Sequence, residues 1–146
     1  EQADVLTVYD SHGGYNHPDH VQVHRVGVRA AELAATPRVY ESTMNRDFIR
    51  SLMTDRANEV SDLPDAPDAA EMDDFGSPEE VITTTVDVSD FVKVKRAAME
   101  AHASQIPADS FFLSLPEDAF AVAFGQEWFI RRDAPNIRET WLFEDL

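Results

Sequence analysis

A short apolar run that enters a Gly-Gly turn and continues into a proline-started helix most limits what this chain can form. Residues 5–9 are Val-Leu-Thr-Val-Tyr, a pattern typical of a buried strand. Gly13 and Gly14 follow the strand, and His17-Pro18-Asp19-His20 opens an alanine-rich helical stretch. The order strand, loop, helix predicts an α/β fold, with functional groups gathered in the loop after the strand.

The rest of the chain continues this alternation. Pro18 suits the first position of a helix that we expect to reach Ala35, and Val23, Val26, Ala30 and Ala34 recur on one of its faces. The remaining patterns predict, in chain order, a strand at 38–40, a helix capped by Asn45 and reaching 58, a strand at 81–88, a helix at 91–104, a helix at 116–124 and a strand at 127–131.

Length and charge exclude several classes of protein. We expect 146 residues to form a single domain, 1–146, in which residues 61–80 are an acidic, proline-rich surface loop. The formal net charge of −16 argues against a nucleic-acid partner and against docking on an anionic membrane. No apolar run reaches the roughly 18 residues that a membrane-spanning helix needs.

The residue types that are missing narrow the chemistry further. The chain has no cysteine, so disulfides, thiolate metal sites and cysteine nucleophiles are excluded. A metal ion would need His, Asp or Glu ligands. The sequence has no Gly-x-Ser-x-Gly elbow and no phosphate-binding loop.

The His-Pro-Asp-His stretch supplies candidates for a metal-dependent hydrolase. His20 lies in the first helical turn, where packing fixes its orientation, and is a candidate metal ligand. His17 precedes a proline and is therefore biased to extended backbone, so its ring can project as an acid or an oxyanion stabiliser. Asp19 could orient one of the two rings, and the Tyr15 phenol could stabilise developing negative charge.

There are three other readings of these histidines. His17 and His20 could merely cap the helix and face solvent. His20 and His24 have the spacing of a zincin pair, but the residues between them include no Glu to act as base. A structural zinc site built from His17, His20 and His24 would lack a fourth ligand at useful spacing.

The stretch from Gly13 to His20 resembles the second signature of the PIG-L, or LmbE-like, family of zinc-dependent N-deacetylases. Within that family it is most similar to the mycothiol-pathway deacetylases and S-conjugate amidases. The similarity continues through 21–34, 38–45, 86–88 and 95–105. It implies a Rossmann-like three-layer α/β sandwich, of which this chain is the C-terminal portion.

The resemblance also implies roles for single residues. His20 would be a zinc ligand, and His17 would stabilise the oxyanion and protonate the leaving amine. Asp19 would tune His17, and Tyr15 would assist at the oxyanion or the substrate. The implied reaction is hydrolysis of an N-acyl group on an amino sugar, by a cytoplasmic enzyme.

One departure from the family is severe. Its first signature, Ala-His-Pro-Asp-Asp-Glu, supplies the other zinc ligands and the general base, and it does not occur here. We therefore expect the chain to be part of a longer enzyme, inactive alone, that associates with the missing N-terminal half or with another copy of itself. The alternative is a non-catalytic binding or assembly module that keeps the fold without a complete metal site.

Overall fold

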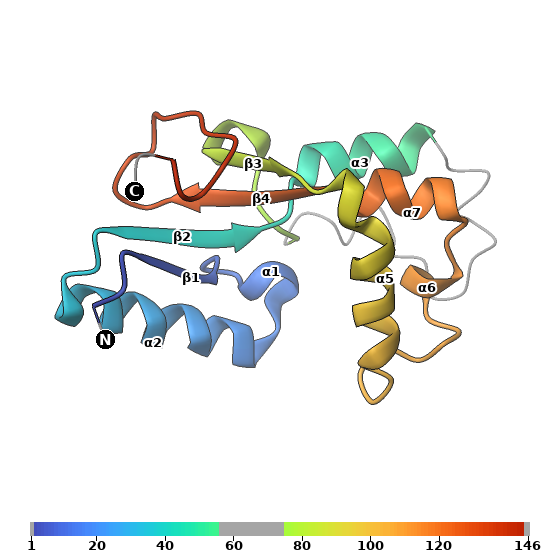
Figure 1. Ribbon diagram of the computed structural model, residues 1–146, viewed down its shortest axis with the longest axis horizontal. Coiled ribbons are helices and arrows are strands. Elements are labelled where there is room, and N and C mark those ends of the chain that lie inside the picture. The colour runs from blue at the N-terminus through green and yellow to red at the C-terminus, as the bar shows by residue number, and fades with distance from the viewer. Residues whose placement is uncertain (1, 56–74, 145–146) are drawn as a thin grey trace.

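The computed structural model describes residues 2–55 and 75–144, and its centre is a mixed four-stranded sheet of order β1-β2-β4-β3 (Figure 1). β1 runs parallel to β2, whereas β4 is antiparallel to both β2 and β3. The strands are β1 (Val5–Tyr9), β2 (Arg38–Thr43), β3 (Thr84–Asp87) and β4 (Gln126–Arg131). The predicted α/β class is confirmed, and the Rossmann-like arrangement stays a prediction.

The helices form two groups around this sheet. In Figure 1, α2 runs along β1 and β2, whereas α5, α6 and α7 lie together beyond the C-terminal ends of these strands. The helices are α1 (Gly13–Asn16), α2 (Pro18–Ala34), α3 (Arg46–Asp55), α5 (Val92–Ala101), α6 (Phe111–Ser114) and α7 (Glu117–Phe124), with 3-10 turns η2 (Glu79–Val81) and η3 (Ser89–Phe91). None of the helices in the described ranges is long and apolar enough to cross a membrane.

Two differences from the predicted elements have physical causes. The expected strand at 81–88 is shorter, because Glu79–Val81 forms a 3-10 turn and only Thr84–Asp87 pairs with β4. The strand expected at 38–40 is longer and reaches Thr43, because β4 pairs along that additional length. Residues 61–74 of the predicted acidic loop, and the predicted helix end at 58, lie outside the described residues.

α2 packs closely on β1 because of a glycine in the middle of the helix. A Cβ atom at Gly27 would lie 2.4 Å from Cγ1 of Val8, whose side chain is buried. The glycine therefore lets the helix backbone approach the strand more closely than any side chain would permit.

Gly27→Ala tests this close approach. Alanine favours the helix by about 1 kcal/mol, but the clash with Val8 forces helix and strand apart. We expect the free energy of unfolding to fall by about 1–3 kcal/mol in urea denaturation. Val26→Ala, at an exposed position of the same helix, is the control and should change it by about 0.5 kcal/mol or less. A Gly27→Ala protein as stable as the unsubstituted chain would contradict the packing argument.

The apolar face that the sequence predicted for this helix is not the buried one. Val23 is 47% exposed and Val26 is 67% exposed, whereas Ala31 is buried at 4%. The helix meets the strand with a neighbouring face, on which Gly27 and Ala31 lie. β1, on which the helix packs, is an edge strand of the described sheet.

The C-terminal segment packs on the sheet through one apolar and one charged side chain. Leu142 is buried with Tyr40, Val86 and Phe129, whereas the neighbouring Trp141 and Phe143 are about half exposed. Of Trp141, Leu142 and Phe143, it is therefore Leu142 that anchors this tail on the sheet.

Glu139 is the charged contact of the tail, and its carboxylate is buried against the sheet. It accepts hydrogen bonds from the Tyr40 hydroxyl (3.0 Å) and the Thr84 hydroxyl (2.9 Å), and it pairs with Arg131 (2.6 Å). Burial, and then the hydrogen bond to Glu139, raise the pKa of Tyr40 above its usual value. Tyr40 lies on β2, Thr84 on β3 and Arg131 on β4. Because all three contact the Glu139 carboxylate, this cluster joins the three strands to the tail.

Candidate functional site

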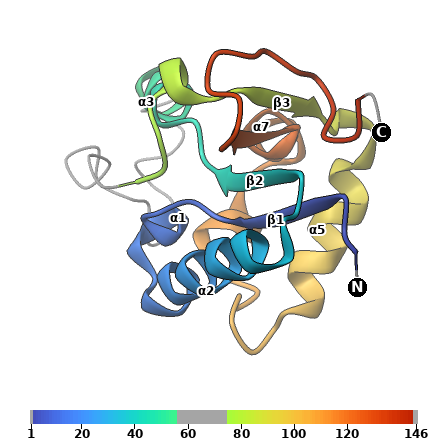
Figure 2. The same cartoon turned by 90° about the vertical axis from the view of Figure 1, so that its left-hand side faces the viewer.

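The candidate site lies at the C-terminal ends of the parallel strands β1 and β2. β1 ends at Tyr9, and residues 10–17 lead from it into α2. Figure 2 shows the same connection from the side, with β1 running into α1 and α1 lying at the start of α2. In open α/β sheets, ligands bind outside the carboxyl ends of the strands.

Four rings meet at this loop: Tyr9, Tyr15, His17 and His20. The ring centroids of His17 and His20 are 4.7 Å apart. The Tyr15 ring meets both imidazoles edge to face, with centroids 5.8 Å from His17 and 5.2 Å from His20. The structure therefore brings together three of the side chains that the sequence singled out.

The His20 ring is held by two separate contacts. It stacks on the Tyr9 ring, with centroids 3.9 Å apart and planes inclined by 4°. Its Nδ1 lies 3.2 Å from the carbonyl oxygen of Gly13. Because a carbonyl only accepts, Nδ1 is the donor in this bond, and the lone pair of the neutral ring is then on Nε2.

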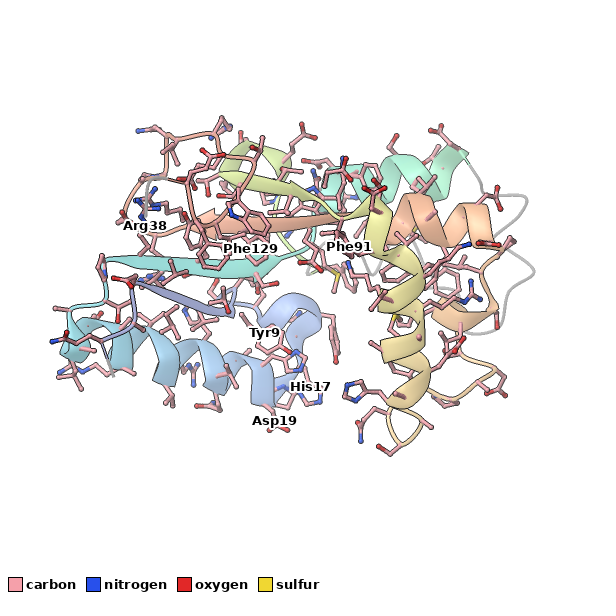
Figure 3. The ribbon with its side chains drawn as sticks, in the orientation of Figure 1. Tyr9, His17, Asp19, Arg38, Phe91 and Phe129 are labelled. Atoms are coloured by element: carbon pink, nitrogen blue, oxygen red, sulfur yellow. The ribbon has the colours of Figure 1, made fainter. Side chains whose placement is uncertain are left out.

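The neutral His17 ring has the opposite tautomer to His20. The backbone N–H of Asp19 donates to its Nδ1 (3.2 Å), so the proton of the neutral ring is on Nε2. His17 is thus the N-cap of α2, as the capping alternative expected, and its ring also faces His20. Asp19 itself is exposed, and it lies beside His17 at the first turn of α2 (Figure 3).

His24 holds α2 against the sheet. Its Nδ1 is 2.9 Å from the carbonyl oxygen of Tyr9 and 3.7 Å from the carboxylate of Glu41. Since the carbonyl only accepts, this nitrogen also donates. These contacts give His24 a packing role one turn beyond His20.

Sequence reasoning missed two residues of this site, Tyr9 and Asp10. The sequence pattern predicts Tyr9 only as the end of a strand, yet its ring stacks on His20. Asp10 is 1% exposed, and its carboxylate accepts from two backbone N–H groups of the turn. An Asp shortly before a Gly-Gly pair is a recognisable turn signal, because its side chain bonds the backbone a few residues on.

Two more distant segments hold the loop in place. The Thr43 hydroxyl, at the end of β2, donates to Oδ2 of Asp10 (2.5 Å) and lies 3.0 Å from the Ser77 hydroxyl. The N–H of Gly76 donates to the carbonyl oxygen of Gly14 (2.7 Å). The loop is therefore attached to β2 and to the segment that follows residue 74.

The comparisons with known proteins agree on one group of enzymes, although no family model matches the sequence. The chain is 36% identical to the 1D-myo-inositol 2-acetamido-2-deoxy-alpha-D-glucopyranoside deacetylase of Streptomyces avermitilis. The alignment has a length of 163 residues and covers 96% of this chain and 53% of that protein. The deacetylase of the same name from Acidothermus cellulolyticus is 37% identical, and the match covers 86% of this chain and 44% of that protein. The one from Thermomonospora curvata is 32% identical, with 97% of this chain and 54% of that protein covered.

The chain belongs to the PIG-L (LmbE-like) deacetylase family. The resemblance seen in the sequence is thereby confirmed. The chain spans about half the length of the curated relatives that it matches.

A metal centre needs more ligands than the described part of the chain brings together. Within residues 2–55 and 75–144, no group of three or more His, Asp or Glu side chains could hold a metal ion. His20 fits as one ligand, because its Nδ1 is engaged by Gly13 and its Nε2 lone pair is available. The described residues therefore do not complete a zinc site.

Proposed function

We propose that this chain is part of a deacetylase that hydrolyses the N-acetyl group of an amino sugar linked to inositol. The observation that supports this most directly is the cluster of Tyr15, His17 and His20 at the end of β1. It occurs in a chain that is 36% identical, over 96% of its length, to a deacetylase named for an acetamido sugar joined to inositol.

His17 is the proton donor of the proposed reaction. In the neutral ring Nδ1 accepts from the Asp19 N–H, and Nε2–H can donate a hydrogen bond to the oxygen of the amide. To protonate the amide nitrogen the ring must first take up a proton, which the attacking water releases, and it then returns to the neutral form. The amine that leaves must be protonated, and an imidazole is suited to this at neutral pH. Asp19, in the first turn of the helix, would orient the His17 ring through its backbone N–H.

Tyr15 would assist at the developing oxyanion. Half of its side chain is exposed, and its ring is in contact with both imidazoles. A phenol hydroxyl in this position can donate a hydrogen bond to negative charge on the substrate oxygen.

His20 would hold a zinc ion through Nε2, with the remaining ligands supplied from outside the described residues. A bound zinc would supply Lewis acidity and a water of lowered pKa. The contribution of this chain to that centre is one ligand whose ring is fixed by Tyr9 and Gly13.

The proposal is tested by joining this chain to the part of the Streptomyces avermitilis deacetylase that the alignment does not cover. We expect the joined protein to bind one zinc ion and to release acetate from the acetamido sugar of its relative. This chain alone should do neither.

Two outcomes would contradict the proposal. One tightly bound zinc ion per copy of the isolated chain, lost on His20→Ala, would mean that the chain completes its own site. A joined protein that folds and binds zinc without hydrolysis would favour the non-catalytic module.

A further inference from the structure

The buried carboxylate of Asp10 has no part in the chemistry proposed above, yet it lies at the centre of the loop. It is 1% exposed at the end of β1, and all its described partners belong to the loop or to the end of β2. We propose that Asp10 is a positioning residue that, through the Gly13–Gly14 turn, keeps the His20 ring protonated on Nδ1 and directs its Nε2 into the site.

The first step runs from Asp10 to the turn. Oδ1 accepts from the backbone N–H of His12 (3.1 Å) and of Gly14 (2.8 Å), while the main-chain oxygen of Asp10 accepts from Gly13 (3.0 Å). One residue thus binds three successive backbone N–H groups. It holds Gly13 and Gly14 at φ of +65° and +73°, which glycine adopts readily and other residues rarely do.

The second step runs from the turn to His20. A Cβ atom at Gly13 would lie 2.8 Å from Cβ of His20 and 2.9 Å from the backbone nitrogen of Val21. Only glycine permits the turn to approach the first turn of α2 this closely. The approach places the Gly13 carbonyl 3.2 Å from Nδ1 of His20, and this acceptor favours the Nδ1–H tautomer.

The third step explains why Asp10 itself does not rotate. Its second oxygen, Oδ2, accepts from the Thr43 hydroxyl (2.5 Å), which in turn lies 3.0 Å from the Ser77 hydroxyl. Both carboxylate oxygens are therefore occupied, one by the turn and one by β2. The orientation of the carboxylate is set by the sheet and passed to the loop.

The use of Nε2 as a metal ligand rests on the proposed function, whereas the tautomer does not. A ring fixed in the Nδ1–H form presents its lone pair in one direction only. The tautomer can be measured on this chain without metal or substrate. A failure of the tautomer assignment is therefore distinguishable from a failure of the deacetylase proposal.

The test is nitrogen NMR of the full 146-residue chain with labelled histidine, recorded at increasing pH until the His20 ring shifts stop changing. We expect a pyrrole-like Nδ1 and a pyridine-like Nε2 in the unsubstituted chain. In Asp10→Ala the ratio of the Nδ1–H to the Nε2–H form should fall by roughly threefold to tenfold, the effect of losing about one hydrogen bond. Exchange of the Gly14 amide proton should accelerate at the same time.

Two further variants separate positioning from stability. Asp10→Asn keeps the acceptor for His12 and Gly14, and its amide can donate to Thr43, whose hydroxyl then turns to Ser77; it should retain the tautomer. Glu139→Gln alters another buried carboxylate, in the tail cluster away from the loop, and should lower stability without changing the His20 ratio.

Three results would overturn the proposal. His20 of the unsubstituted chain could prove to be protonated on Nε2. A folded Asp10→Ala chain could keep the original ratio, or Glu139→Gln could shift it as much as Asp10→Ala does. If Asp10→Ala does not fold, Asp10→Ser takes its place, because its shorter hydroxyl cannot hold both backbone donors, and an unchanged ratio there would count equally against the proposal.

Discussion

His17→Asn is expected to lower the turnover number of the joined enzyme by about two to four orders of magnitude while one zinc ion stays bound. Asparagine at this position can still accept from the Asp19 N–H and cap α2. It cannot donate and regain a proton as an imidazole does. The loss of activity is thereby separated from any loss of the helix cap.

Two companion variants complete this experiment. His17→Ala should lose the same turnover and about 1 kcal/mol of stability as well, because the cap is removed. His20→Ala should lose the zinc and with it the activity. The measurements are acetate release, zinc content and thermal unfolding on the same preparations. Equal loss of zinc from the His17 and His20 variants would show that these roles are wrongly assigned.

Arg131→Ala is expected to lower the free energy of unfolding by about 3–5 kcal/mol. The guanidinium of Arg131 pairs with Glu139 at 2.6 Å, and the side chain of that carboxylate is only 4% exposed. Removal of the arginine leaves a buried negative charge with hydroxyl donors from Tyr40 and Thr84 alone among the described contacts. An uncompensated buried charge is far more costly than the loss of a surface pair.

The control for this prediction is an exposed ion pair of the same kind. Arg29 and Glu32 lie 2.8 Å apart on α2 with side chains 65% and 56% exposed, so Arg29→Ala should change the stability by about 0.5 kcal/mol or less. Urea denaturation of both variants at neutral pH gives the comparison. Similar small losses in the two variants would contradict a buried charge cluster at Glu139.

The sequence predicted the helix starts correctly where a single residue and its near neighbours determine them. Pro18 begins α2, and the Asn45 side chain accepts from the N–H of Phe48 at the start of α3 (3.0 Å), both as expected. The loop histidines could also be placed, because the strand before them and the helix after them leave few positions for their rings. His17 and His20 accordingly lie in contact.

The sequence was a poorer guide where the outcome depends on which neighbour a residue meets. α2 has apolar side chains on more than one face. The face that packs on β1 is the one with Gly27, because the missing side chain lets the helix approach Val8 closely. Asp10 and Tyr9 were missed for a similar reason. Their roles depend on Thr43 and His20, which reach them only once the sheet and α2 have formed.

The hydrogen bond from the Gly76 N–H to the Gly14 carbonyl has a consequence for the order of folding. β1, α2 and β2 are consecutive, so their contacts form at modest cost in loop-closure entropy. The segment that fastens Gly14 is much later in the chain, and contacts of long sequence separation tend to be established late in folding. A peptide that ends after β2 would therefore contain every residue of the His-Pro-Asp-His stretch and still lack the geometry that gives those residues their chemistry.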